Sequence, residues 1–259
     1  MFLLYQIIIS ILVLISPIIL IYRILINKED KKRFVEKFSL PSEVRRNGKL
    51  IWFHGASVGE ILSIIPLLKN YENNKSIKQI LITSSTLSSS KVLKKYKFKK
   101  TTHQFYPIDQ IFFTNNFLNY WKPSLAIFID SEIWPCMFKG IYKKKIPLVL
   151  LNARITNKSF QNWSKIKNFA ESIFNKITVA YPQNIETKKF LKKFNLKKIK
   201  EIGNLKFAEN YEENLLNLSS NLKNELRFKK VWVASSTHIN EEVFCARTHL
   251  ALKKRVKNL

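Results

Sequence analysis

The feature that most constrains this chain is its first apolar segment. No charged residue occurs between Phe2 and Tyr22. A basic cluster follows it directly: Arg23, Lys28, Lys31, Lys32 and Arg33. Roughly twenty helical residues, each rising ~1.5 Å, are long enough to cross a hydrocarbon core of ~30 Å. We therefore predict a membrane anchor helix over residues 1–26, either a single span or a deeply inserted helix.

A signal peptide and a buried globular helix both fit the apolar segment less well. A signal peptide has a basic start and a cleavage site of small residues, whereas the first three residues here carry no side-chain charge. A buried helix of a globular domain is rarely apolar on every side and then basic at its end. By the positive-inside rule, the basic cluster places the following domain in the cytoplasm.

The charge of the chain is strongly positive, with 45 Lys and Arg against 18 Asp and Glu and a formal net charge of +27. Such a surplus attracts polyanions, either nucleic acid or an anionic lipid surface. The alternative is a compositional bias, since Lys, Asn and Ile are abundant along the whole chain. The sequence shows neither a basic helix nor paired surface aromatics in an RNA-binding pattern, and it therefore gives no support to a nucleic-acid-binding module. Charge alone does not decide between a polyanionic partner and a compositional bias.

Cysteine and histidine give no sign of a metal site. The two cysteines, Cys136 and Cys245, are far apart, and the 4 His form no cluster with them. This usage fits a reducing cytosol and predicts neither a disulfide framework nor a zinc site.

Beyond the anchor, short apolar runs alternate with amphipathic stretches. We predict helices at 60–68 and 88–96, and strands at 50–53, 79–83, 124–129, 146–151, 177–180 and 199–202. Alternating strands and helices indicate an α/β fold with a parallel sheet covered by helices on both faces. Ligands of such sheets bind beyond the carboxyl ends of the strands.

The domain boundaries follow from changes in composition. We predict a juxtamembrane connector at 27–48, a first domain at 49–207, a linker at 208–229 ending in a helix at 215–226, and the beginning of a second domain at 230–259. This last part reads as a strand at 231–234, a loop at 235–238 and a helix at 240–256. One βα unit cannot bury its own apolar faces, so we expect the second domain to be incomplete.

Three segments carry side chains suited to chemistry just after predicted strands. In the first, HGASVGE at 54–60, glycines permit close approach of a ligand, and Glu60 is placed as a general base or, alternatively, as an acidic residue countering the helix dipole. In the second, DSEIWP at 130–135, Asp130 and Glu132 are placed to orient that base, to raise its proton affinity or to hold hydroxyls. Alternatively they cap a helix, with Asp130 or Ser131 at its N-cap. Both roles can hold at once.

The third segment, NARIT at 152–156, offers Arg154 for bidentate recognition of a carboxylate or phosphate, or for a structural salt bridge. Near the C-terminus, the Ser235–His238 loop presents hydroxyls before a helix that begins with Glu241 and Glu242. The alternative there is an ordinary capped helix.

In order, five segments resemble the serial motifs of one family: HGASVGE, DSEIWP, NARIT, GNLKF at 203–207 and ASSTHINEE at 234–242. The family is that of the Kdo transferases, which move 3-deoxy-D-manno-octulosonic acid (Kdo) from CMP-Kdo onto the lipid A precursor of lipopolysaccharide. The resemblance covers the chain from about Leu50 to its end, and the apolar first helix matches the family's anchor.

The resemblance implies a GT-B fold of two Rossmann-like domains, the first binding the acceptor and the second mostly binding CMP-Kdo. It implies inversion at the anomeric carbon with no metal, and no cofactor besides the donor substrate. Glu60 would be the catalytic base. The acceptor site would comprise Ser57, Gly59, Asp130, Glu132 and Arg154, and the donor site Ser236, Thr237 and His238.

The implied partners are CMP-Kdo, the lipid A precursor lipid IVA and anionic inner-membrane lipids, with no nucleic acid. The implied location is the inner membrane, with a single anchor and the catalytic domain on the cytoplasmic face. The alternatives are another membrane-associated GT-B lipid glycosyltransferase, or a non-catalytic remnant that binds only the acceptor.

The chain departs from the family pattern at Asp130, where Glu is usual, at Asn240, where Gly is usual, and at Tyr181–Asn184, where a Gln-Ser-Glu type sequence is common. The later donor-binding segments of the family do not follow residue 259. We therefore expect this chain, on its own, to bind CMP-Kdo poorly and to be inactive.

Overall fold

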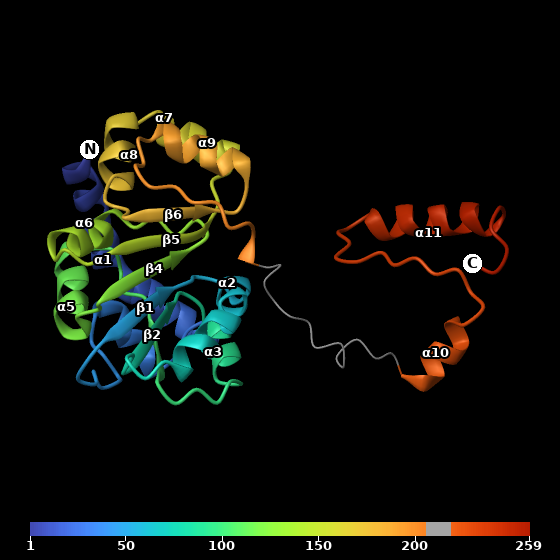
Figure 1. The fold of residues 1–259 in the computed structure, drawn as a ribbon, viewed down its shortest axis with the longest axis horizontal. Coiled ribbons are helices and arrows are strands. Elements are labelled where there is room, and N and C mark those ends of the chain that lie inside the picture. The colour runs from blue at the N-terminus through green and yellow to red at the C-terminus, as the bar shows by residue number, and fades with distance from the viewer. Residues whose placement is uncertain (206–218) are drawn as a thin grey trace. The chain divides into compact units, whose positions relative to one another are not determined.

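Two units make up the chain, and the computed structural model describes residues 1–205 and 219–259 of them. The first unit, Met1–Glu209, contains a six-stranded sheet with helices around it (Figure 1). The second unit, Asn210–Leu259, contains two helices among its described residues. Each unit is described by itself.

All strands of the sheet run parallel, in the order β3-β2-β1-β4-β5-β6. They are β1 (Leu50–His54), β2 (Gln79–Ser84), β3 (Thr101–Phe105), β4 (Leu125–Ile129), β5 (Leu148–Ala153) and β6 (Val179–Pro182). The predicted α/β class is confirmed. The strand order reverses direction between β1 and β4, and in open α/β sheets ligands bind in the crevice at that switch point.

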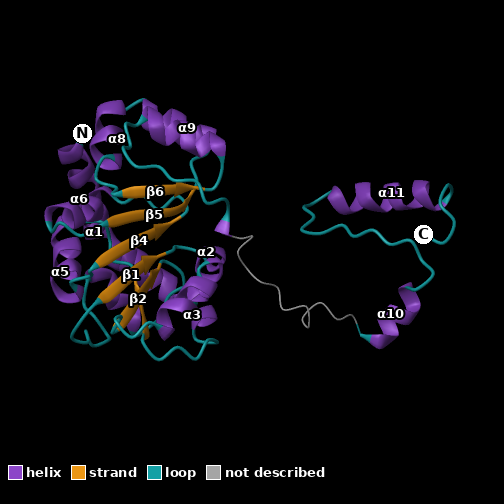
Figure 2. Ribbon diagram, viewed as in Figure 1, coloured by secondary structure: helices purple, strands orange, loops and turns teal. Residues whose placement is uncertain are grey.

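Helices cover both faces of the sheet (Figure 2). Side chains alternate along a strand, so Ile51 and Phe53 of β1 point to one face and Leu50 and Trp52 to the other. The first face packs against α2 (Val58–Ser63), α3 (Ile65–Asn73) and α4 (Leu87–Leu93). The second packs against α5 (Ile111–Trp121), α6 (Pro135–Lys143), α7 (Asn157–Ser164), α8 (Lys167–Phe174) and α9 (Ile185–Lys193).

The apolar first segment forms one helix, α1 (Phe2–Leu25), long and apolar enough to cross a membrane. Most of its partly or fully covered side chains recur every three or four residues, at Phe2, Tyr5, Ile9, Val13, Ser16, Leu20 and Arg23; Gln6 and Ile24 adjoin this set. That spacing is one stripe of a helix. The outward positions are dominated by exposed apolar side chains, among them Leu4, Ile8, Ile11, Ile15 and Ile18.

Both ends of α1 are attached to the first unit. At its start, the ring of Phe2 lies 6.3 Å from that of Phe169, and Lys139 Nζ lies 3.9 Å from the Phe2 ring centre. At its end, Arg23 pairs with the buried Glu29 at 3.2 Å, and Lys37 pairs with the same carboxylate. A helix of 24 residues is roughly 36 Å long. The helix therefore lies along the unit.

The segment after α1 packs against the free edge of the sheet. The 3-10 helix η1 (Arg33–Phe38) carries Glu36, which is fully buried. Glu36 Oε2 accepts a hydrogen bond from Phe105 N at 2.6 Å, and Arg33 donates to the backbone oxygen of His103 at 2.7 Å. Strand β3 was not predicted from its sequence TTHQF, because polar side chains obscure its period. Its edge groups are satisfied by η1, which blocks further strand pairing.

Two predicted strands are wrong. Residues 199–202 contribute only a single bridge, between Ala180 and Ile199. Residues 231–234 pair with no strand among the described residues, because the second unit offers no neighbour for their backbone groups.

The second unit has little interior. Its helices are α10 (Ser220–Leu226) and α11 (Glu241–Lys253), which confirm the predicted helices in part; residues 215–218 lie outside the described residues. No described residue of this unit is buried, and Val233 and Phe244 are 79% and 72% exposed. Packing of these 41 described residues therefore supplies no hydrophobic core.

Candidate functional site

Glu60 lies in the first turn of α2, just past the carboxyl end of β1. Ser57 is the N-cap, and its Oγ accepts a hydrogen bond from Glu60 N at 3.3 Å. In return the Glu60 carboxylate accepts from Ser57 Oγ at 2.8 Å and from Ala56 N at 2.7 Å. The arrangement is a variant of the capping box, with Ala56 N in place of the N-cap N–H, so the alternative role of Glu60 at the helix start is present in the structure. The same contacts hold its carboxylate at a defined place on the sheet edge.

The two glycines of this loop differ in their surroundings. A Cβ on Gly55 would lie 3.1 Å from Glu60 Cβ and 3.3 Å from Ile61 Cδ1, so loop and helix pack closely at this glycine. A Cβ on Gly59 would meet no atom within 4 Å. Gly59 therefore leaves open surface over the first turn of α2.

Glu132 and Asp130 follow β4, the neighbour of β1. Glu132 Oε2 accepts a hydrogen bond from Trp134 Nε1 at 2.9 Å and lies 3.2 Å from His54 Nε2. Asp130 has a φ of 61°, in the left-handed region where Asp is among the better tolerated residues. The prediction that Asp130 or Ser131 caps the next helix is wrong, because α6 begins at Pro135 with Trp134 as its N-cap. Neither carboxylate therefore caps α6.

The three carboxylates interact electrostatically. Burial raises the pKa of Glu60, and the negative charges of Glu132 and Asp130 raise it further, while the hydrogen bonds from Ser57 and Ala56 act in the opposite direction. A carboxyl group whose pKa is raised toward neutrality is a better proton acceptor than an ordinary surface carboxylate. The direction of this pKa shift agrees with the role of general base that the sequence predicts for Glu60.

Arg154 follows β5, the next strand along. Its backbone N–H donates to the Asp130 carbonyl at 3.3 Å, so the two loops are adjacent. The side chain is exposed, and its guanidinium has no ion pair or hydrogen bond with any residue that the structure describes. The alternative role in a structural salt bridge is therefore not seen within the described ranges. An exposed guanidinium with no partner among the described residues remains available to an anionic ligand.

The NARIT and GNLKF segments also adjoin. Asn152 Oδ1 accepts a hydrogen bond from Leu205 N at 3.1 Å. Residues 206 and 207, the last two of the GNLKF segment, lie outside the described residues. Four of the five motif segments thus lie in the first unit, on its sheet edge or beside it.

The predicted donor residues belong to the second unit. Thr237 Oγ1 donates to Glu242 at 3.0 Å, and His238 N donates to Glu241 at 2.8 Å, as a capped helix start would. Asn240, the N-cap of α11, has a φ of 78°. That left-handed conformation favours glycine and tolerates asparagine, which accounts for Asn at a position where the family has Gly.

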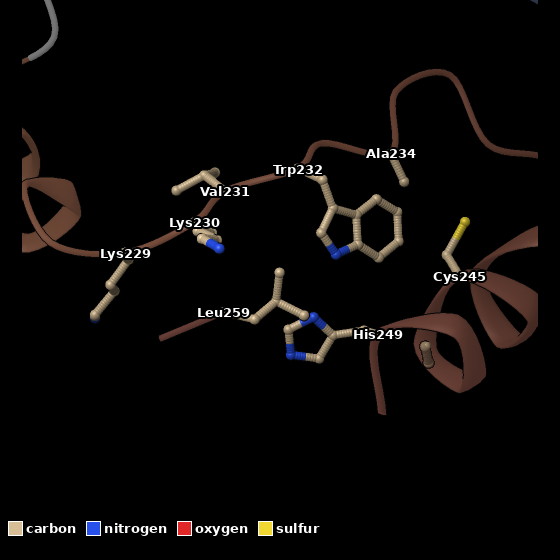
Figure 3. A pocket seen from close by; sticks show the side chains of 9 residues that line it. Lys229, Lys230, Val231, Trp232, Ala234, Cys245, His249 and Leu259 are labelled. Atoms are coloured by element: carbon tan, nitrogen blue, oxygen red, sulfur yellow. The ribbon is translucent and has the colours of Figure 1, made fainter. Parts of the chain in front are cut away.

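A cavity of about 440 Å³ also lies in the second unit (Figure 3). Its lining includes Trp232, Cys245, His249 and Leu259, and the rings of Trp232 and His249 are 6.2 Å apart. Neither Ser236, Thr237 nor His238 lines it. The cavity is the gap between the extended segment and α11, and it does not coincide with the predicted donor site.

No group of three or more His, Cys, Asp or Glu side chains among the described residues is placed to hold a metal ion. Several residues that contact Glu132, or contact His54 behind it, were not identified from the sequence as functional: His54, Thr83, Tyr106 and Trp134. His54 and Trp134 lie within the motif segments, so their positions in the sequence could have identified them. No local sequence pattern marks Thr83 and Tyr106, since they meet His54 only because strands far apart in the chain lie side by side.

Comparison with known proteins identifies the family. The model of the 3-deoxy-D-manno-octulosonic-acid transferase (Kdo transferase) family, in its N-terminal part, matches residues 32–209. The chain belongs to the Kdo transferase family. Two relatives are the 3-deoxy-D-manno-octulosonic acid transferases of Rickettsia bellii, 38% identical over 92% of this chain, and of Rickettsia typhi, 35% identical over 93%.

The chain spans 57% and 62% of the length of those two relatives. Among solved structures, a UDP-N-acetylglucosamine 2-epimerase from Rickettsia bellii aligns with 70% of this chain and 51% of its own, at 12% identity and a TM-score of 0.48.

Proposed function

We propose that the first unit is the acceptor-binding part of an inverting Kdo transferase, with Glu60 as its general base. In this proposal Kdo passes from CMP-Kdo to lipid IVA, the lipid A precursor. The observation that carries the proposal is the electrostatic grouping of Glu60, Glu132 and Asp130 at the switch point of the sheet, with the exposed Arg154 on the adjacent loop. The family membership supports the choice of Kdo as the transferred sugar.

The proposed chemistry is a single displacement. Glu60 removes the proton from the acceptor hydroxyl as the oxygen attacks the anomeric carbon of Kdo, and CMP leaves from the opposite face. One carboxylate suffices for this, because CMP leaves as an anion and needs little help from an acid. Glu132 and Asp130 would bind the sugar hydroxyls of the acceptor, together with Ser57 and the open surface over Gly59. Arg154 would bind a phosphate or carboxylate of a substrate.

The donor would bind through the segment containing Ser236, Thr237 and His238, and we expect no cofactor besides CMP-Kdo. The residues proposed for the acceptor site belong to the first unit, and those proposed for the donor site belong to the second. The experiment must therefore use this chain as well as a version completed with the C-terminal domain of a close relative.

The membrane association that we propose follows from α1. The outward side of the helix is dominated by exposed apolar side chains, whereas a helix on the surface of a soluble protein turns polar side chains outward. Since both ends of α1 contact the unit, its outward side would lie in the lipid while the sheet remains in the cytoplasm. Basic side chains at its end, such as Lys28 and Lys31, would meet anionic inner-membrane lipids.

The test is transfer of labelled Kdo from CMP-Kdo to lipid IVA in membranes. We expect the completed version to be active and its Glu60→Gln variant to lose about 10²–10⁴-fold in kcat, the range for a general base. Glu186→Gln, at an exposed position of α9, is the matched control and should retain full activity. A folded, completed enzyme that binds lipid IVA but transfers a different sugar would favour another lipid glycosyltransferase.

A second candidate is acceptor binding without turnover. It is favoured by the second unit, in which no described residue is buried. Retention of lipid IVA binding by this chain, with no transfer at any donor concentration, would support that function.

A further inference from the structure

A chain of hydrogen bonds runs behind the site, from the core to Glu132. Trp52 Nε1 donates to Thr83 Oγ1 at 2.9 Å, and Thr83 Oγ1 lies 3.0 Å from His54 Nδ1. His54 Nε2 in turn lies 3.2 Å from Glu132 Oε2. Trp52, Thr83 and His54 are fully buried, whereas 17% of the Glu132 side chain is exposed. Of these four hydrogen-bonded residues, Glu132 is therefore the one that a ligand can reach.

The order of donors determines the tautomer of His54. An indole N–H can only donate, so Thr83 Oγ1 is the acceptor from Trp52 and keeps its own hydrogen for another partner. The nearest acceptor is His54 Nδ1, because the other candidate, Phe53 O, lies at 3.4 Å. A neutral imidazole that accepts at Nδ1 carries its proton at Nε2. That proton points to Glu132.

The opposite tautomer is unfavourable at this place. Nδ1–H could donate to the Thr83 backbone oxygen at 3.2 Å, but the bare Nε2 would then face the Glu132 carboxylate at 3.2 Å. Two lone pairs would oppose each other in a buried setting, where an unmet acceptor is costly. The charged form is disfavoured because burial lowers the pKa of His54, even though Glu132 acts in the opposite direction.

The His54 ring has little freedom to turn. It stacks on Tyr106 with ring centres 3.9 Å apart, and Phe128 lies edge-on at 5.0 Å. Glu132 Oε2 therefore meets a fixed N–H of His54 and a second one from Trp134. Glu132 Oε1 makes no hydrogen bond with any residue in the described part of the chain, so it is the oxygen left for a ligand.

We propose that His54 is a positioning residue, a neutral Nε2–H donor with its tautomer fixed by Thr83, which holds the Glu132 carboxylate ready for a hydroxyl of the acceptor. The role in acceptor binding rests on the proposed function, whereas the tautomer does not. Preorganised donors of this kind hold a reacting constellation in place without reorganisation on binding.

The tautomer is tested on the wild-type chain in detergent micelles, by nitrogen NMR of labelled histidine at pH 7. The resonance of His54, assigned as the one absent from His54→Gln, should show a protonated Nε2 and an unprotonated Nδ1. Thr83→Val removes the hydroxyl at nearly constant shape and should shift the population toward Nδ1–H, whereas Thr83→Ser should not. A charged His54, or the Nδ1–H tautomer in the wild type, would overturn the proposal.

The positioning role is tested by the affinity of the same chain for lipid IVA in micelles. His54→Leu removes the donor and should weaken binding about tenfold, the effect of one hydrogen bond to a charged group. His54→Gln can place an amide N–H near the position of Nε2 and should restore most of the affinity. Equal binding by His54→Leu and His54→Gln would refute the positioning role. Should the leucine variant not fold, Thr83→Val against Thr83→Ser gives the same comparison.

If the wild type does not bind lipid IVA at all, the proposed function fails while the tautomer remains measurable. The two failures are therefore distinct.

Discussion

Glu60 and Asp109 both lie past the carboxyl end of a strand of the same sheet, and burial raises the pKa of both. Their partners differ. Glu60 is bound by its own loop, through Ser57 and Ala56. Asp109 is 2% exposed and accepts hydrogen bonds from Tyr5 Oη of α1 at 2.7 Å and from Cys136 N and Met137 N of α6 at 2.9 and 2.8 Å.

The difference separates two uses of a carboxyl group with a raised pKa. The partners of Glu60 lie within four positions of it in the sequence, so they position one side chain at an accessible edge. Those of Asp109 join α1, the segment after β3 and the start of α6, which follows directly on the loop of Glu132. We therefore expect substitution of Glu60 to change chemistry and substitution of Asp109 to change stability.

Asp109→Ala should show the largest effect on stability. It removes three hydrogen bonds from buried or partly buried donors, each contributing ~1 kcal/mol, so the free energy of unfolding should fall by ~3 kcal/mol. Urea unfolding in detergent micelles at pH 5 measures it. Glu186→Ala, at an exposed position, should change the same quantity by less than ~0.5 kcal/mol. Equal losses for the two variants would remove the distinction drawn for Asp109.

The pH dependence of stability sharpens the same contrast. Burial raises the pKa of Asp109 from 3.8 to about 6, so the folded state binds the proton more tightly than the unfolded state does. The stabilisation is complete below pH ~4 and is lost as the pH rises through about 6, by up to ~3 kcal/mol.

Asp109→Asn should abolish this component. The measurement is the difference in unfolding free energy between wild type and variant at pH 4, 5, 6 and 7, in which the other titrating groups cancel. The wild type should lose stability relative to the variant across this range. A difference that does not change with pH would show that Asp109 titrates normally.

Much of the sheet could be predicted from the sequence, because a parallel strand that is buried on both faces reads as an apolar run. This holds for β1, β2 and β4, which follow their predicted ranges closely. Strand β3 could not be predicted, since its edge is completed by Glu36 from a segment 69 residues earlier. The strand predicted at 231–234 fails for the converse reason: its apolar run has no neighbouring strand with which to pair.

The candidate site also has a part that the sequence could predict and a part that it could not. The rule that ligands bind beyond the carboxyl ends of strands led from sequence to Glu60, Glu132 and Arg154, because that rule needs only strand ends. The contact between His54 and Glu132 needs more. It joins residues 78 apart and depends on β1 lying beside β4, which no local pattern specifies.

Glu132→Gln should alter the chemistry of Glu60 without breaking its loop. The negative charge of Glu132 raises the pKa of Glu60, so its removal should lower that pKa and move the acid limb of the pH profile of kcat/KM to lower pH. The completed enzyme is the material. Asp130→Asn should shift the limb in the same direction by less, since Asp130 contributes less to the pKa of Glu60. A shift to higher pH in either variant would contradict Glu60 as the base.

The smallest expected effect belongs to Tyr5→Phe, which removes only the hydroxyl that α1 donates to Asp109. The free energy of unfolding should fall by ~1 kcal/mol, the net contribution of one hydrogen bond, and Tyr22→Phe, at an exposed position of the same helix, should have no measurable effect. The loss should disappear when Tyr5→Phe is placed in the Asp109→Ala background, because the partner is already gone. Additive losses would mean that the Tyr5 hydroxyl stabilises the chain independently of Asp109, and that Asp109 joins two parts of the first unit rather than three.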